Sequence, residues 1–334
     1  MSHIARAAPK PAAPPFGSLS PTRRRGEAKI TPPHVVPFLD QTADALQSIE
    51  RIPAAWGALL DGLRRLRDAA HTPDWHAAVR AHRLAVLLRE EPATAWAFRR
   101  PRGRAGDARL LDYLYEHPSA VDDRAAWSAR GRVMNAMLVS CAVAAALQER
   151  RRVLARLLDG AAGRVNGATG LVLGCGHMRE IEFAHALDRF DAILGLDPEP
   201  ASIATVQADY RAIANLRAEH ASVADILAAV NDGPGFDVAY ATSLYDVLDE
   251  RRAAGLTARL FAALKPGGRL LLSSFCPGVL DYGYMDAVMD WPVAVRDEAA
   301  LHRLIDGLPG TEIARATLFR GRNRVMVYAL VERR

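Results

Sequence analysis

Apolar residues in the first half of the chain recur at the spacing of amphipathic helices. Over residues 35–89 and again over 123–158 they follow one another mostly at intervals of three and four positions, which gathers them on one helix face. Residues 1–33 are rich in proline, alanine, arginine and serine and lack this period. We therefore expect a flexible leader over 1–33 and a helical domain over 34–163.

The pattern changes near Gly167, where short β-rich segments begin to alternate with helical ones. This alternation is typical of βαβ units around a parallel sheet. The expected strands cover residues 170–174, 191–197, 216–220, 236–241, 269–275, 312–318 and 324–331. They predict an α/β fold over 164–334, a Rossmann-like doubly wound sheet of seven strands.

Composition narrows the class of protein. Hydrophobic residues make up 50% of the chain and charged residues 24%, which is typical of a folded globular protein. The sequence has neither an apolar run of about 18 residues nor the apolar segment of a signal peptide. Cys141, Cys175 and Cys276 lie far apart, without the spacing of metal ligands. We expect a cytoplasmic protein with no membrane span and no metal site.

The net charge of +5 comes mainly from arginines, since all but three of the 43 basic residues are arginine. They are scattered along the chain and do not form the continuous basic stripe of a nucleic-acid binder. We therefore expect no nucleic-acid partner.

The segment LVLGCGHMREIE, residues 171–182, combines a buried strand with a glycine turn and an expected helix. Gly174 and Gly176 allow a sharp turn and close approach of the backbone to a ligand, and a helix N-terminus beyond them would be positive. Cys175 between them is expected to be a small buried spacer. The second strand ends in Asp197, 23 residues after Gly174, where nucleotide-binding α/β folds place an acid for the ribose hydroxyls.

Ligands in such sheets bind at the carboxyl ends of the strands. Glu180 is expected to face the cofactor's amino-acid end, or else to complement the helix dipole. Small residues after the third strand would border an adenine ring. The expected cofactor contacts are Gly174, Cys175, Gly176, Glu180, Asp197, Pro198, Ser222, Val223 and Ala241.

Two nucleotide-binding classes compete for this pattern. A dinucleotide fingerprint needs a third glycine where this chain has Arg179, so a nicotinamide-dependent oxidoreductase is disfavoured. Residues 260–275, LFAALKPGGRLLLSSF, resemble the corresponding turn of class I S-adenosylmethionine-dependent methyltransferases. Together with the glycine turn and Asp197, this resemblance covers about residue 167 to the C-terminus and implies S-adenosylmethionine as cofactor.

A closer resemblance is to the bacterial 3-hydroxypalmitic acid methyl ester synthases of extracellular-factor signalling. It rests on residues 99–107 (RRPRGRAGD), 174–182, 243–256 and 285–296. The chain departs from that subgroup at Arg104, Ser243, Val247 and Val295, so the methyltransferase activity carries over more firmly than the fatty-acid acceptor.

Methyl transfer requires in-line alignment of the acceptor atom with the methyl group and sulfur. Arg296 or Arg104 would position a carboxylate acceptor, whereas His177, Tyr245 or Asp246 would take a proton from a hydroxyl or amine. The remaining residues expected to bind the acceptor are Asp107, Tyr115 and Tyr282. Three structural roles compete with these assignments: a core position for Tyr245, a lid salt bridge between Arg102 and Asp107, and an ordinary packed loop around Tyr282.

We therefore predict an S-adenosylmethionine-dependent methyltransferase acting on a carboxylate or hydroxyl of a small molecule, a specialised metabolite or a lipid signal. The helical domain would cover the acceptor pocket or form a homodimer. The alternatives are an N-methyltransferase of a small metabolite and a non-catalytic protein that binds S-adenosylmethionine.

Overall fold

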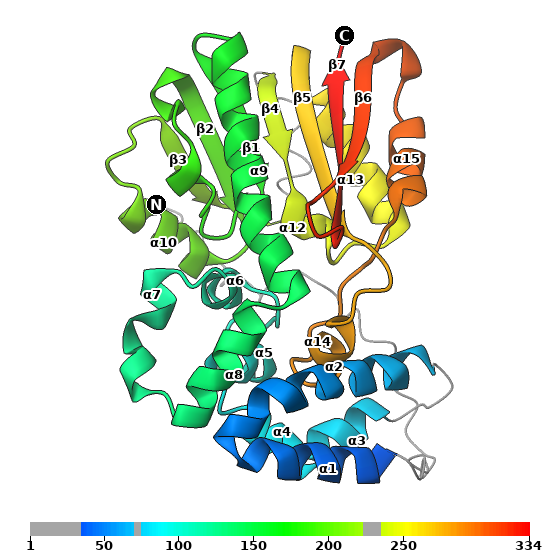
Figure 1. Ribbon diagram of the computed structural model, residues 1–334. Coiled ribbons are helices and arrows are strands. Elements are labelled where there is room, and N and C mark those ends of the chain that lie inside the picture. Colours follow the sequence, from blue (N-terminus) through cyan, green and yellow to red (C-terminus); the bar gives the residue numbers. More distant parts are fainter. Residues whose placement is uncertain (1–34, 70–74, 223–234) are drawn as a thin grey trace, which may run out of the picture.

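The computed structural model describes residues 35–69, 75–222 and 235–334 (Figure 1). Within them, seven strands form one sheet in the order β3-β2-β1-β4-β5-β7-β6. The first five strands pair in parallel, and β7 runs antiparallel to β5 and β6. The strands are β1 Ala168–Leu173, β2 Phe190–Asp197, β3 Leu216–His220, β4 Phe236–Tyr240, β5 Leu264–Phe275, β6 Ile313–Arg320 and β7 Met326–Arg333. The predicted α/β fold is confirmed.

The strand order reverses between β1 and β4, because the chain leaves β1 toward β2 and later returns on the other side of β1. At such a switch point the connections diverge and open a crevice at the carboxyl ends of the strands. This places the expected site between the ends of β1, β2 and β4.

The first part of the chain is helical and lies at that end of the sheet (Figure 1). Its helices are α1 Val35–Gln47, α2 Ile52–Asp68, α3 Trp75–Ala81, α4 Arg83–Leu88, α5 Pro92–Arg99, α6 Ala108–Leu114, α7 Pro118–Val121, α8 Ala129–Val139 and α9 Ala142–Arg164. We call α1 to α8 the helical unit. The long α9 leaves it and packs along β1 and β4. The segment after β5 returns to the helical unit, where α14, Tyr282–Ala287, packs on α2 and α3.

One hydrophobic core joins the helical unit to the face of the sheet covered by α9. The other face packs against α13, Glu250–Ala262, and α15, Glu298–Asp306. The remaining helices are α10, Pro200–Asp209, and the short α12, Thr242–Tyr245. Among the described residues no single helix is long and apolar enough to cross a membrane; α8 and α9, bent by 60°, pass that test only as a pair.

The helix expected after the glycine turn is absent from residues 174–189. The connection instead contains the 3₁₀ turns Ile181–Phe183 and Leu187–Arg189. Its polar groups are satisfied from outside: Asp159 of α9 accepts hydrogen bonds from the backbone N–H groups of His185 and Ala186, and Asp112 of α6 binds two side chains of the connection. The positive helix end predicted beside the turn therefore does not exist.

Candidate functional site

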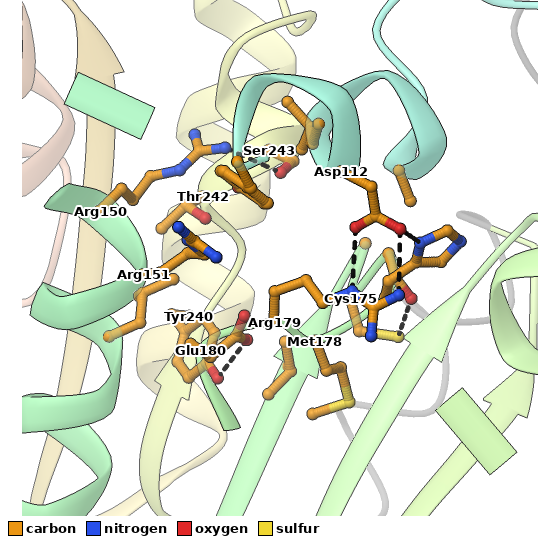
Figure 2. Close-up of a pocket in the computed structure, with 18 of the residues that line it drawn as sticks. Asp112, Arg150, Arg151, Cys175, Met178, Arg179, Glu180, Tyr240, Thr242 and Ser243 are labelled. Carbon is orange, nitrogen blue, oxygen red and sulfur yellow. Dashed lines mark hydrogen bonds and ion pairs between the residues drawn. The ribbon is translucent and has the colours of Figure 1, made fainter. Parts of the chain in front are cut away.

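A pocket lies at the carboxyl ends of β1 and β4, between them and helices α6 and α9 (Figure 2). The turn after β1 forms its floor, α9 contributes Arg150 and Arg151, and the start of α12 contributes Thr242 and Ser243. Of the predicted site residues, Gly174, Cys175, Gly176, His177, Glu180 and Tyr115 line this pocket.

The glycine turn has the conformation that its sequence predicts. Gly174 and Gly176 have φ angles of +62° and +56°, a region that favours glycine. A Cβ atom on Gly174 would lie 2.9 Å from the side chain of Leu244. Cys175 is buried and, as expected, fills space beside Gly195; burial raises the pKa of its thiol well above the ordinary value. Met178 also has a positive φ of 50°.

Asp197 is fully buried at the end of β2. One carboxylate oxygen accepts a hydrogen bond of 2.8 Å from the N–H of Gly176, and the other accepts one of 2.9 Å from the N–H of Glu199. Asp197 therefore joins the end of β2 to the glycine turn. Its role as a ribose ligand stays a prediction.

A segment of the helical unit, residues 100–107, covers this side of the site. Arg102 Nε lies 2.9 Å from a carboxylate oxygen of Glu199, and its terminal nitrogen lies 3.2 Å from Nε2 of His177. Arg104 reaches Glu199 at 3.9 Å. Pro198, Ser222 and Ala241, which we expected around the nucleoside, do not line the pocket, and Val223 lies outside the described residues.

The floor of the pocket carries a buried acid. Glu180 accepts a hydrogen bond of 2.8 Å from the hydroxyl of Tyr240, and burial raises the pKa of Glu180 above its ordinary value although Arg150 and Arg151 lower it (Figure 2). Glu180 follows the turn directly but is not in a helix, so the dipole alternative falls away.

Arg151 is 8% exposed and lines the same pocket. Its guanidinium stacks 4.0 Å from the ring centre of Tyr115 and 5.0 Å from that of Phe183. In the described part of the chain it forms no ion pair, and its Nε has no hydrogen-bond partner. Burial lowers the pKa of Arg151 accordingly.

The neighbouring Arg150 is paired. Its guanidinium lies 3.1 Å from Asp246 and 3.5 Å from the hydroxyl of Ser243. Burial raises the pKa of Asp246 to about 6 against the pull of Arg150. The second carboxylate oxygen of Asp246 is buried and has no hydrogen-bond partner in the described ranges.

Four predicted site residues have structural contacts instead. The Tyr245 hydroxyl bonds Thr257 of α13 at 2.8 Å, so Tyr245 is a core residue turned away from the pocket. Tyr282 donates to the backbone carbonyl of Cys276 at 2.6 Å. The Arg296 guanidinium donates to the carbonyls of Tyr245 and Leu248 at 2.7 and 2.5 Å. The predicted roles of these residues, proton removal for Tyr245 and acceptor binding for Tyr282 and Arg296, are therefore not supported by their geometry.

Asp107 is the fourth predicted site residue with a structural contact. It caps α6 by accepting a hydrogen bond of 2.8 Å from the N–H of Leu110, and it also accepts one of 3.0 Å from the indole N–H of Trp96. Arg102 pairs with Glu199, so the expected lid contact exists with a different acid.

The sequence reasoning missed Asp112, Arg150 and Arg151. A signal existed for Arg150: it lies three positions after Leu147 and four before Leu154, on the apolar face of α9. A charged residue on an apolar helix face needs a buried partner or ligand.

No protein-family model and no curated protein matches the chain. Solved structures, in contrast, do match the chain. A possible exported protein from Bordetella parapertussis is 16% identical and covers 89% of this chain and 96% of its own, with a TM-score of 0.56. This similarity shows a shared fold that includes most of the helical unit. The expected cytoplasmic location stays a prediction.

The other similar structures include methyltransferases. N-methyltransferase NodS from Bradyrhizobium japonicum is 15% identical and covers 56% of this chain and 95% of its own, with a TM-score of 0.40. Magnesium protoporphyrin IX methyltransferase from Synechocystis, with bound S-adenosylmethionine, is 14% identical and covers 68% and 98%, with a TM-score of 0.43.

Proposed function

We propose that this protein is an S-adenosylmethionine-dependent methyltransferase with a small-molecule acceptor. One observation carries the proposal: beside a glycine turn at the switch point of the sheet, the pocket holds a buried guanidinium, Arg151, that has no ion-pair partner among the described residues, together with a buried carboxylate, Glu180. These two charges complement the carboxylate and ammonium groups of an amino acid, which form one end of S-adenosylmethionine.

The residues fit that ligand on physical grounds. A buried charge without a partner costs several kcal/mol of free energy, in practice of order 3–5 kcal/mol, unless a counter-charge is supplied. A ligand carboxylate would relieve this cost at Arg151, and a ligand ammonium would favour the ionised form of Glu180, whose pKa burial raises. The nucleoside would then extend toward Asp197, beneath the segment 100–107.

A dinucleotide fits this site poorly. Its pyrophosphate binds to the N-terminus of a helix that follows the glycine turn, and residues 174–189 contain only short 3₁₀ turns. Glu180 would also repel a pyrophosphate from the floor of the pocket. The nicotinamide-dependent oxidoreductase therefore stays disfavoured.

The cofactor would supply a methyl group on a sulfonium, which is a good leaving group, so the chain has mainly to bind and align the two reactants. Asp246 does not itself line the pocket, but it pairs with Arg150, which does, and it is our candidate to take a proton from a hydroxyl acceptor. It directly follows α12, one of its carboxylate oxygens has no hydrogen-bond partner among the described residues, and its pKa of about 6 suits a general base near neutral pH. This replaces Tyr245 as a candidate base.

A carboxylate acceptor needs no base, and the resemblance to the 3-hydroxypalmitic acid methyl ester synthases favours one. Arg150, whose terminal nitrogens reach Ser243 and Asp246, replaces Arg104 and Arg296 as its anchor. We therefore propose O-methylation of a carboxylate or hydroxyl by in-line displacement.

The test is calorimetric titration of the full-length protein with S-adenosylmethionine and S-adenosylhomocysteine, with NAD as the control. We expect micromolar binding of both sulfur nucleosides and none of NAD. Acceptor panels of carboxylates, hydroxyls and amines, read by mass spectrometry, then separate O-methylation from N-methylation. Binding without transfer to any class would favour the non-catalytic alternative, and preference for NAD would overturn the proposal. Light scattering of the same sample tests the alternative that the helical domain forms a homodimer.

A further inference from the structure

A cluster of charged side chains joins the helical unit to the glycine turn, and the mechanism above does not use it. Its centre is Asp112 of α6, which is fully buried. Asp112 accepts a hydrogen bond of 2.8 Å from Nδ1 of His177 and bonds of 2.9 and 3.0 Å from Arg179 (Figure 2). Burial raises the pKa of Asp112, but these two donors outweigh it and hold that pKa well below its ordinary value, so the carboxylate is ionised.

The contacts on both sides of His177 define the protonation of its ring. A guanidinium can only donate hydrogen bonds. Because a terminal nitrogen of Arg102 lies 3.2 Å from Nε2 of His177, that ring nitrogen accepts, and the proton is on Nδ1, from which it is donated to Asp112. His177 thus presents an acceptor, the Nε2 lone pair, toward Arg102.

Arg102 also binds Glu199, which follows β2. Its guanidinium therefore contacts one residue that follows β1 and one that follows β2, and the backbone N–H of the latter, Glu199, binds Asp197, the predicted ribose ligand. One guanidinium from the helical unit thus donates to His177 and forms an ion pair with Glu199 on the side of the site where the hydroxyl groups of a nucleoside are expected.

We propose that Asp112 is a positioning residue that holds His177 as the Nδ1–H tautomer, and that Nε2 of His177 accepts a hydrogen bond from a ribose hydroxyl once Arg102 withdraws. The ribose contact in this inference rests on the proposed function. The inference makes the helical unit part of the nucleoside site through Asp112, a residue that does not touch the ligand.

The first test needs no ligand. The imidazole ¹⁵N shifts of the ¹⁵N-histidine-labelled full-length protein report the tautomer of each ring, and the signals missing in His177→Phe are those of His177. We expect the Nδ1–H tautomer in the wild type and loss of that preference in Asp112→Leu and in the milder Asp112→Asn. Asp107→Asn, on the same helix and equally buried, is the matched control and should leave the tautomer unchanged. Retention of the tautomer in both Asp112 variants would overturn the proposal.

The second test is a double-mutant cycle on binding of S-adenosylhomocysteine. Asp112→Asn and His177→Phe should each weaken binding up to about tenfold, the usual range for one hydrogen bond. The double variant should be no weaker than the weaker single variant, because Asp112 acts through His177. Asp107→Asn combined with His177→Phe should be additive.

Additive effects of Asp112 and His177 would overturn the positioning role. Failure of the wild type to bind S-adenosylhomocysteine would overturn the proposed function and the ribose contact together. The tautomer measurement would still decide the relation between Asp112 and His177 by itself.

Discussion

Arg150 and Arg151 are neighbours on α9, yet their environments are opposite. Arg150 is paired with Asp246, whereas Arg151 is held by stacking on Tyr115 and Phe183 without an ion-pair partner among the described residues. Replacing Arg151 by methionine keeps much of the packing and removes the charge. We expect Arg151→Met to weaken S-adenosylmethionine binding at least tenfold in calorimetry, because a charge-assisted hydrogen bond contributes about 1.5–3 kcal/mol.

The matched control is Arg150→Met, since it removes the same group one position earlier. That change leaves the buried Asp246 without its partner, and breaking a buried pair in this way costs about 3–5 kcal/mol of stability. Arg151→Met should leave the free energy of unfolding unchanged or raise it. Equal destabilisation by the two variants, with unchanged affinity for the cofactor, would contradict the assignment.

The raised pKa of Asp246 predicts a pH dependence of stability. The group has a pKa of about 6 in the folded protein and an ordinary value of 3.8. Folded Asp246 therefore binds a proton that the unfolded chain has already released between these values, so its contribution to stability is complete below pH 3.8 and is lost as the pH rises through 6. The difference corresponds to about 3 kcal/mol.

Urea unfolding of the wild type and Asp246→Asn between pH 4 and 7 measures this contribution. The free energy of unfolding of the wild type should fall relative to that of the variant over this range. Asp249→Asn, at a position that is 53% exposed, should show no such trend relative to the wild type. A constant difference between wild type and Asp246→Asn would refute the raised pKa.

At the scale of elements, the segment 100–107 is a cover over the nucleoside side of the site. It is held to the end of β2 by Arg102, whose side chain is 19% exposed, and more weakly by Arg104. Because a ligand must displace this contact, Arg102→Gln should tighten S-adenosylhomocysteine binding severalfold, in line with about 1 kcal/mol for a partly exposed ion pair. Stopped-flow fluorescence should show faster association.

Arg104→Gln is the control for the loss of one positive charge, and its effect should be smaller. Weaker binding by Arg102→Gln would mean that Arg102 contacts the ligand itself and would contradict its role in the cover.

The elements differ in how far the sequence predicts them. The strands were predictable because each is a short apolar run between turn residues, a local property. The predicted start of β5 was wrong: residues 264–268 also belong to the strand, with a shift in its pairing with β4 and a φ of +77° at Gly267. The helix after Gly176 was wrong because Asp112, distant in sequence, binds the residues that would have begun it.

The site residues, too, were predictable only where a local sequence pattern marks them. The turn, Asp197 and Glu180 were found because each directly follows a strand end or the turn itself. The roles of Arg296 and Tyr282 depend on which backbone carbonyls the fold brings to them, and no local pattern contains that information. Val86 is a further example: it belongs to the apolar residues of 35–89 that were expected to gather on one helix face, yet it is 65% exposed.

At the scale of the whole molecule, the sequence predicts two folded domains that divide at residue 163, and this division stays a prediction. The packing argues for a single cooperative unit. One hydrophobic core extends from Val35 of α1 to Tyr328 of β7, and α14 ties the segment after β5 back to α2 and α3. Arg67 and Arg80 strengthen that return through ion pairs with Asp286 and Asp290.

The tryptophans allow this cooperativity to be measured. All five lie in the helical unit or in the segment after β5, as Trp56, Trp75, Trp96, Trp127 and Trp291, so their fluorescence does not report on the sheet directly. Far-ultraviolet circular dichroism reports on both parts. If the shared core couples them, urea unfolding curves from the two probes should coincide, and S-adenosylhomocysteine should shift both midpoints equally. A fluorescence transition at lower urea would mean that the helical unit opens alone, in which case the cover over Glu199 and His177 would be released without unfolding the sheet.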